Sequence, residues 1–147
     1  MSATLSITRA APWARRYARW ALGAAFLSGI ASRFGWWGAG VGYGSFERFL
    51  AYTAEVNAFM PAATIPFLGW SATVLELVFG VLLIVGLWPR RVALGSAVLL
   101  ALFGVAMAIS FGPKEPLDYS VFSASAAALL LASAEPAPDA PAQEPSA

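Results

Sequence analysis

The apolar stretch from Phe67 to Trp88 constrains the fold of this chain more than any other segment. As an α-helix of about twenty residues at ~1.5 Å per residue, it is long enough to cross the hydrocarbon core of a bilayer. Its single ionisable group is Glu76, which lies roughly 14 Å from the Phe67 end and near the midplane of a spanning helix. A carboxyl at this depth costs at least ~2.5 kcal/mol by insertion scales, so we expect it to point into a helix bundle.

The predicted bundle face of this helix is small and polar. At i, i+3 and i+4 spacing it comprises Gly69, Thr73, Glu76, Gly80 and Leu83, and the remaining residues are mostly Leu, Val, Ile and Phe. The substitution Glu76→Leu removes the only ionisable group of this helix and is therefore expected to leave its insertion into the membrane intact or to ease it.

Composition agrees with a membrane protein and excludes several kinds of chemistry. Of the 147 residues, 59% are hydrophobic and 12% are charged, against about 25% charged in a typical soluble domain. The net charge of +1 gives no bulk attraction to nucleic acid. There is no Cys and no His, which excludes thiolate and imidazole metal sites, cysteine nucleophiles and His-based triads within this chain. We expect no catalytic residue and no metal site, so a redox role would need a bound small molecule or a partner.

The predicted fold is all-α, an integral membrane four-helix bundle with a short amphipathic interfacial helix between its first two helices. Pro12, Pro61 and Pro89 mark helix boundaries, and glycines punctuate the connection from Gly35 to Ser45. A disordered lead (1–11) and a disordered Pro/Ala-rich tail (134–147) flank a single domain (12–133). Its membrane helices are expected at about 13–33, 67–88, 92–111 and 117–133, and its interfacial helix at about 45–60.

Charge distribution predicts the orientation. Basic residues precede the first helix and separate the second from the third, so both segments, and with them both termini, are placed on the cytoplasmic side. The arginines expected to contact lipid headgroups are Arg15, Arg16, Arg19, Arg90 and Arg91. A cleaved signal peptide is the alternative interpretation of the first apolar stretch.

Small residues recur on the first predicted membrane helix. Ala21, Ala25 and Gly29 form one row, and a second row holds Ala24, Ser28 and Ser32. Such rows let helix backbones approach closely within a lipid bilayer, and they permit a homo-oligomer.

Glu76 is the leading candidate for function. It could relay a proton, bind a cation or hydrogen-bond the polar head of a ligand, together with Thr73, Ser28, Arg33 and Trp70 as candidate ligand-binding residues. The structural alternative is a carboxyl bonded to Thr73, Ser28 or a backbone carbonyl of another helix. Arg33 ends the first membrane helix, and its side chain either reaches inward to Glu76 or, as is commoner, snorkels to the headgroups.

Several short motifs, taken in their order along the chain, resemble the DoxX family of small bacterial four-helix membrane proteins. They are Arg19-Trp20, Leu22-Gly23, Phe26 and Ser28-Gly29; Phe49, Tyr52, Phe59 and Pro61; Thr73, Glu76, Gly80, Leu83 and Gly86; Met107, Ser110-Phe111-Gly112 and Pro116-Leu117-Asp118-Tyr119-Ser120-Val121-Phe122-Ser123. The resemblance covers about residues 12–133. It implies a bacterial inner-membrane bundle associated with redox or oxidative-stress partners, since the family is named for its association with thiosulfate:quinone oxidoreductase.

Three functions remain open at the level of sequence. The first is a quinone- or lipid-binding subunit that supports an oxidoreductase, and a cavity between helices beside Glu76 would favour it. The second is a non-catalytic membrane scaffold that recruits partners, and a tightly packed carboxyl bonded to a neighbouring helix would favour it. The third is a small proton-coupled transporter, which would need a water-filled path to both faces.

Overall fold

The computed structural model describes residues 2–38 and 40–134, and all of its regular structure there is helical. The elements are α1 (Ser2–Arg33), α2 (Phe46–Val56), the short 3-10 helix η1 (Ala62–Thr64), α3 (Ile65–Val85), α4 (Pro89–Phe111), α5 (Lys114–Asp118) and α6 (Val121–Ala134). The prediction of an all-α chain is therefore confirmed for the described residues. The expected disordered tail from residue 135 onward lies outside them.

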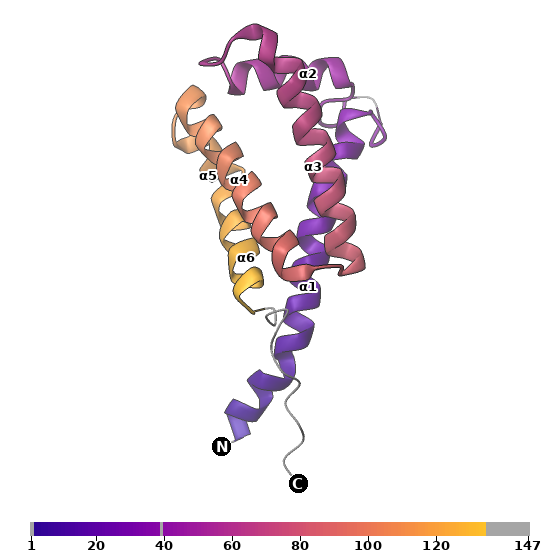
Figure 1. Cartoon of the computed structure of the whole chain (residues 1–147), viewed down its shortest axis with the longest axis vertical. Coiled ribbons are helices and arrows are strands. Elements are labelled where there is room, and N and C mark those ends of the chain that lie inside the picture. The colour runs from indigo at the N-terminus through magenta and orange to yellow at the C-terminus, as the bar shows by residue number, and fades with distance from the viewer. Residues whose placement is uncertain (1, 39, 135–147) are drawn as a thin grey trace.

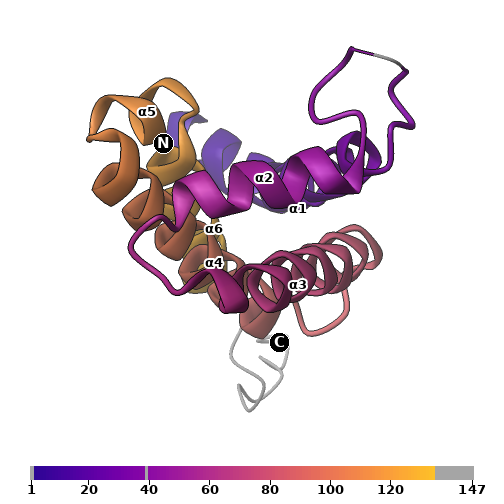
Figure 2. The ribbon, with the colours of Figure 1, turned by 90° about the horizontal axis from the view of Figure 1, so that it is seen from above.

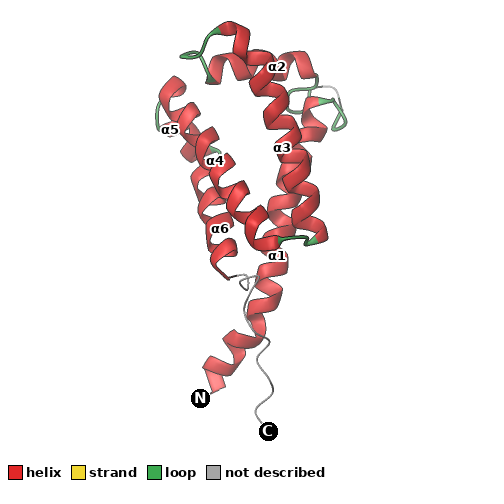
Figure 3. Cartoon of the chain, in the orientation of Figure 1, coloured by secondary structure: helices red, strands yellow, loops and turns green. Residues whose placement is uncertain are grey.

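The helices form two pairs that converge at one end and diverge at the other. α1 packs along α3, and α4 packs along α6, whereas α3 contacts α4 and α1 contacts α6 less extensively. Figures 1 and 3 show the two pairs meeting where α3 ends and α4 begins. At the opposite end α2 crosses between the pairs, as the view from above shows (Figure 2), and it contacts α1, α3 and α4.

The buried face of α3 is the one that the spacing predicts. Its buried residues are Ile65, Gly69, Thr73, Glu76, Gly80 and Leu83. Glu76 is only 4% exposed, so the expectation that its carboxyl points into the bundle is confirmed. The other faces of α3 carry exposed Val, Leu, Ile, Phe and Trp side chains, as expected for a helix that meets lipid.

Close packing of α1 on α3 depends on one glycine outside the predicted rows, Gly23. A Cβ added at Gly23 would lie 2.7 Å from Ile84 Cγ1 and 2.8 Å from the Gly80 backbone oxygen. Of the predicted row Ala21, Ala25 and Gly29, the two alanines are exposed, whereas a Cβ at Gly29 would lie 3.1 Å from Oε2 of Glu76, so Gly29 is the member of this row that faces α3. The buried side of α1 is fixed by larger residues, namely Leu22, Phe26 and Ile30.

The Gly23 contact predicts a position-specific loss of stability. Gly23→Leu should lower the free energy of unfolding by about 1–3 kcal/mol, because the backbone oxygen of Gly80 leaves no room for a side chain. Titration with SDS, followed by circular dichroism, measures the effect. Ala24→Leu is the matched control, since Ala24 is exposed and the change should stay within about 0.5 kcal/mol. Equal losses in both variants would show that Gly23 is not at a tight contact.

The α4–α6 pair is held by small residues and one hydroxyl. Ala128 is fully buried, and the Phe122 ring occupies the space that a Cβ at Gly104 would need. The Ser125 hydroxyl donates a 2.7 Å hydrogen bond to the backbone oxygen of Ala97. These contacts leave the opposite side of α4 facing α3.

Several predicted boundaries are corrected. The α1 backbone is helical from Ser2, so the expected disordered lead at 2–11 belongs to the first helix, whose first turns extend beyond the other helices (Figure 1). The interfacial helix ends at Val56 instead of residue 60. The last predicted helix is divided into α5 and α6, because Ser120 adopts a left-handed conformation with φ of 55°.

Two segments are long and apolar enough to cross a membrane among the residues described, namely Ala62–Val85 and α4. α6 is apolar but shorter, with 14 residues. By length and composition alone, the described chain thus has two helices suited to span a membrane, where the sequence predicts four.

Candidate functional site

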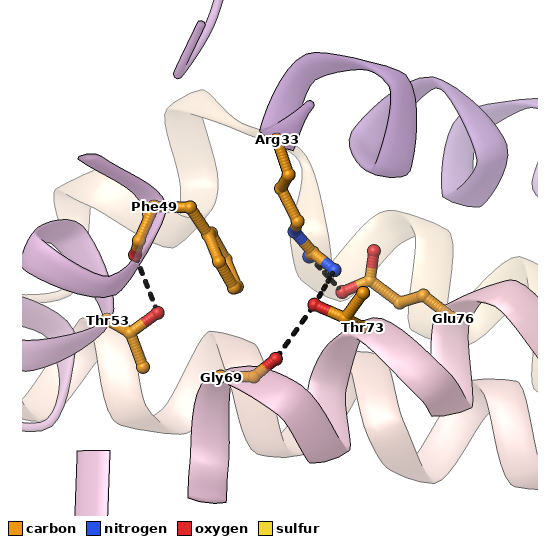
Figure 4. Close-up of polar contacts among 6 residues, drawn as sticks. All are labelled: Arg33, Phe49, Thr53, Gly69, Thr73 and Glu76. Carbon is orange, nitrogen blue, oxygen red and sulfur yellow. Dashed lines mark hydrogen bonds and ion pairs between the residues drawn. The ribbon is translucent and has the colours of Figure 1, made fainter. Parts of the chain in front are cut away.

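A buried ion pair joins α1 to α3. The Nη2 atom of Arg33 lies 2.5 Å from Oε1 of Glu76, and Nη1 of Arg33 donates a 3.0 Å hydrogen bond to Oγ1 of Thr73. The Thr73 hydroxyl in turn donates to the backbone oxygen of Gly69 at 2.8 Å. Figure 4 shows the Arg33 side chain reaching toward the two α3 residues. Arg33 is 5% exposed, so the expectation that it snorkels to the headgroups is wrong: the carboxyl on α3 is close enough to hold it inward.

An aromatic ring of α2 covers the guanidinium. The guanidinium carbon of Arg33 lies 3.9 Å from the centroid of the Phe49 ring, which is a cation–π contact. Phe49 is buried, and on the same helix the Thr53 hydroxyl donates to the backbone oxygen of Phe49 at 2.8 Å (Figure 4). Nε of Arg33 is buried and has no hydrogen-bond partner among the described residues. The ion pair is thus shielded from solvent on the α2 side.

A cavity of about 570 Å³ lies beside this pair, between the diverging helix pairs. α2 and α3 line it from one side and α4 from the other, and Leu, Val, Phe, Ala, Met and Ile make up most of its wall. Its polar lining consists of Arg33, Tyr43, Thr53, Asn57, Ser71 and Glu76. The volume of this cavity and its mostly apolar lining are suited to binding a small molecule that is mostly apolar and has one polar end.

α2 is placed over this cavity by contacts at both of its ends. The Ser45 side chain caps its first turn by accepting a 3.3 Å hydrogen bond from the backbone N–H of Arg48. Leu50 packs onto α3 where Gly69 has no side chain. At the other end, the Ser110 hydroxyl of α4 donates a 2.6 Å hydrogen bond to the backbone oxygen of Val56. α2 therefore bridges α3 and α4 where the two helix pairs are farthest apart.

The glycine-rich connection after α1 positions Tyr43 in the cavity wall. The backbone N–H of Tyr43 donates a 2.9 Å hydrogen bond to the Ser32 hydroxyl, and the N–H of Gly44 donates to the Ser32 carbonyl at 3.0 Å. Gly42 has a φ of +63°, and a Cβ there would meet the Ser32 hydroxyl oxygen at 2.0 Å. Only glycine satisfies both conditions, so this residue permits the loop to fold back onto α1.

The phenol of Tyr43 gives a pH prediction. Burial raises its pKa from 10.0 to about 12, with the neighbouring Tyr52 phenol adding to the rise and the Arg33 charge opposing it. Because the folded chain holds this proton more tightly than the unfolded chain, the resulting stability is present below pH 10 and is lost as pH rises toward 12. Thermal unfolding in detergent should therefore show wild type losing more stability over this range than Tyr43→Phe. Parallel curves for the two proteins would contradict this account.

The structure brings together some of the predicted site residues and separates others. Arg33, Thr73 and Glu76 form one hydrogen-bonded cluster. Ser28 is exposed, and its carbonyl accepts a 3.2 Å hydrogen bond from the Trp37 indole, so it is not a partner of Glu76. Trp70 is 52% exposed and packs against Phe46 with ring centroids 4.4 Å apart, outside the cavity lining.

Three of the five predicted headgroup arginines make contacts within the chain. Arg15 donates a 2.9 Å hydrogen bond to the backbone oxygen of Ala134, the last residue of α6. Arg16 lies over the Trp13 ring at 5.2 Å, and the Arg19 guanidinium packs where a Cβ of Gly86 would be. Arg90 and Arg91 are exposed in the first turn of α4. Arg15 thus lies at the end of α6, Arg19 at the end of α3, and Arg90 and Arg91 at the start of α4.

Sequence reasoning missed the contributions of α2 and α4 to the cavity. Phe49 and Tyr43 lie in segments that were predicted to be interfacial, and the α4 residues carry no polar signal. One signal in the sequence could have located the α2 side of the cavity: Phe49, Thr53 and Val56 recur at helical spacing, and all three are buried.

Comparison with known proteins gives no relative. No family model, no curated protein and no solved structure matches this chain.

Proposed function

We propose that α1, α3, α4 and α6 each span the inner membrane of a bacterium, with α2 at the outer surface and both termini in the cytoplasm. The two longest apolar segments, Ala62–Val85 and α4, support this arrangement, as do the exposed aliphatic side chains on both. The arginines near the converging end are those that the positive-inside rule places in the cytoplasm. The opposite end carries both signs of charge, from Glu47 and Arg48 to Lys114 and Asp118.

Within this arrangement the protein binds a lipid-soluble molecule that has a neutral, hydrogen-bonding head. The observation that carries this proposal is the 570 Å³ cavity, whose apolar wall includes the Arg33–Glu76 pair and Tyr43. Because the pair has no net charge, a neutral head leaves no uncompensated charge in the cavity, whereas an anionic head would. A quinone fits this description, since its carbonyl oxygens accept hydrogen bonds and its ring and chain are apolar. A neutral lipid is the other member of the class.

The role proposed for such a binder is that of an accessory subunit in a membrane redox or oxidative-stress system, as the resemblance to the DoxX family suggests. The chain has no Cys and no His, so electrons would be carried by the bound molecule and by a redox protein partner. In this role the protein holds and orients the molecule for its partner.

A non-catalytic scaffold is the second candidate, and one observation favours it. Glu76 forms an ion pair with Arg33 of the neighbouring helix, so its presence is also explained by the joining of α1 to α3. In that case the pair could be replaced by apolar side chains without loss of function.

Equilibrium binding of decylubiquinone to the purified protein tests the proposal and separates the two candidates. The informative variant is the double substitution Arg33→Leu/Glu76→Leu, because it removes both charges together and leaves no lone buried ion. We expect saturable binding to wild type and loss of binding in a double variant that remains folded. Leu130→Trp, on the exposed face of α6, should bind as wild type does. Absence of saturable binding to wild type would refute a quinone as the bound molecule, and unchanged binding by the double variant would refute the role of the pair.

A further inference from the structure

A second apolar hollow lies next to the cavity that contains Glu76, which we call the Glu76 cavity. This hollow, the α3–α4 groove, has a volume of about 480 Å³. It is lined by Leu75, Phe79, Arg91, Leu94, Gly95, Val98, Leu99 and Leu102. Arg91, at its far end, is the one charged residue among them. The groove therefore offers an apolar surface between two helices that otherwise contact each other only modestly.

The Glu76 cavity and the α3–α4 groove are adjacent and share part of their walls. Leu75 of α3, together with Leu99 and Leu102 of α4, lines both. Along α3 the cavity is lined from Leu68 to Glu76, and the groove continues from Leu75 to Phe79. Along the antiparallel α4 the groove is lined from Arg91 to Leu102, and the cavity continues from Leu99 to Ile109. The two spaces thus follow one line between α3 and α4.

Phe79 of α3 and Gly95 of α4 are in close contact in the wall of the groove. The ring of Phe79 occupies the space beside Gly95, where an added Cβ would lie 2.7 Å from the ring carbon Cζ. From Met107 in the cavity to Gly95, α4 rises roughly 18 Å at ~1.5 Å per residue. The line therefore runs through more than half of a hydrocarbon core of ~30 Å.

We propose that the cavity and the groove form one binding site for a molecule with a neutral head and a single long apolar chain. The head lies against the Arg33–Glu76 pair, and the chain passes Leu75, Leu99 and Leu102 and reaches the Phe79–Gly95 contact. This inference rests on the proposed function and extends it, since it specifies the chain of the ligand. Lipid tails are as apolar as leucine, so the groove selects the chain by its shape and position and not by hydrophobicity.

A photoreactive probe locates the chain directly. The probe is a dimethoxy-methyl-benzoquinone with a decyl chain that carries a diazirine at its far end, and it is applied to the full-length protein in nanodiscs. Crosslinked residues are then identified by peptide mass spectrometry. The competitor is the same quinone without a chain, which can fill only the Glu76 cavity. Crosslinks that the competitor displaces come from the site, and those that it leaves come from surrounding lipid.

We expect competitor-sensitive crosslinks at Phe79, Leu94 and Val98. In Leu102→Trp, which narrows the shared wall at a residue that is 61% exposed, these crosslinks should fall to the level seen with excess competitor. Leu130→Trp on α6 should leave them unchanged. Competitor-sensitive crosslinks confined to Phe59 and Ile109, which line the Glu76 cavity but not the groove, would contradict the proposed position of the chain and leave the proposed function intact. Absence of competitor-sensitive crosslinks anywhere in the protein, together with no saturable binding of decylubiquinone, would overturn both.

Discussion

Glu76→Leu is expected to lower the free energy of unfolding by roughly 3–5 kcal/mol, because it leaves the charge of Arg33 buried without a partner. Arg33 is 5% exposed and its guanidinium is covered by the Phe49 ring, so water cannot solvate the charge without movement of α2. Titration with SDS, followed by circular dichroism, measures the loss. The expectation from sequence concerns membrane insertion, which leucine should leave intact or ease; the loss expected here is in the stability of the folded protein, because of the Arg33 charge.

The double variant Arg33→Leu/Glu76→Leu is the control for this prediction. Since both charges are absent, its stability should return to within about 1 kcal/mol of wild type or exceed it. The coupling energy of the cycle then reports the interaction of the two side chains. Additive losses in the two single variants and the double variant would show that the pair does not exist in the folded protein.

Phe49→Ala is expected to destabilise the protein by about 3 kcal/mol, the lower end of the range for a buried phenylalanine. The ring contributes packing on Tyr43 and Phe46 and a cation–π contact with Arg33, and alanine removes all three. The variant also opens the α2 side of the Glu76 cavity to solvent. We therefore expect decylubiquinone to bind more weakly than the loss of stability alone explains, when binding is measured well below the unfolding temperature.

Phe67→Ala is the matched control for Phe49→Ala. Phe67 lies in the first turn of α3 and is 73% exposed, so its truncation should change stability by no more than about 0.5 kcal/mol. A comparable loss in both variants would indicate that α2 does not pack over the ion pair as described.

The buried face of α3 was predictable because one carboxyl in an apolar helix has only one favourable direction. The spacing of Gly69, Thr73, Glu76, Gly80 and Leu83 identified that face, and all five are buried. The partner of Glu76 was harder to assign. Arg33 ends its helix, where an arginine ordinarily extends to the headgroups, and only the tertiary placement of α3 and α2 makes the inward direction favourable.

The cavity itself could not be predicted from the sequence. It exists because the α1–α3 pair and the α4–α6 pair diverge, and divergence is set by how four helices pack, not by any one of them. The predicted boundaries of the last helix were wrong for a local reason. Ser120 adopts a left-handed conformation that favours glycine, so nothing in its residue type marks the break between α5 and α6.

Native mass spectrometry of the wild-type protein, released from the membranes in which it was produced, tests the central claim most directly. We predict one additional mass of a neutral, long-chain molecule on the wild type, identified as a quinone or a neutral lipid by organic extraction. The mass should be absent from the Arg33→Leu/Glu76→Leu variant and present on Leu130→Trp. A wild type that retains no such molecule, or that retains it no better than the double variant, would contradict the account and leave the Arg33–Glu76 pair as a structural link between α1 and α3.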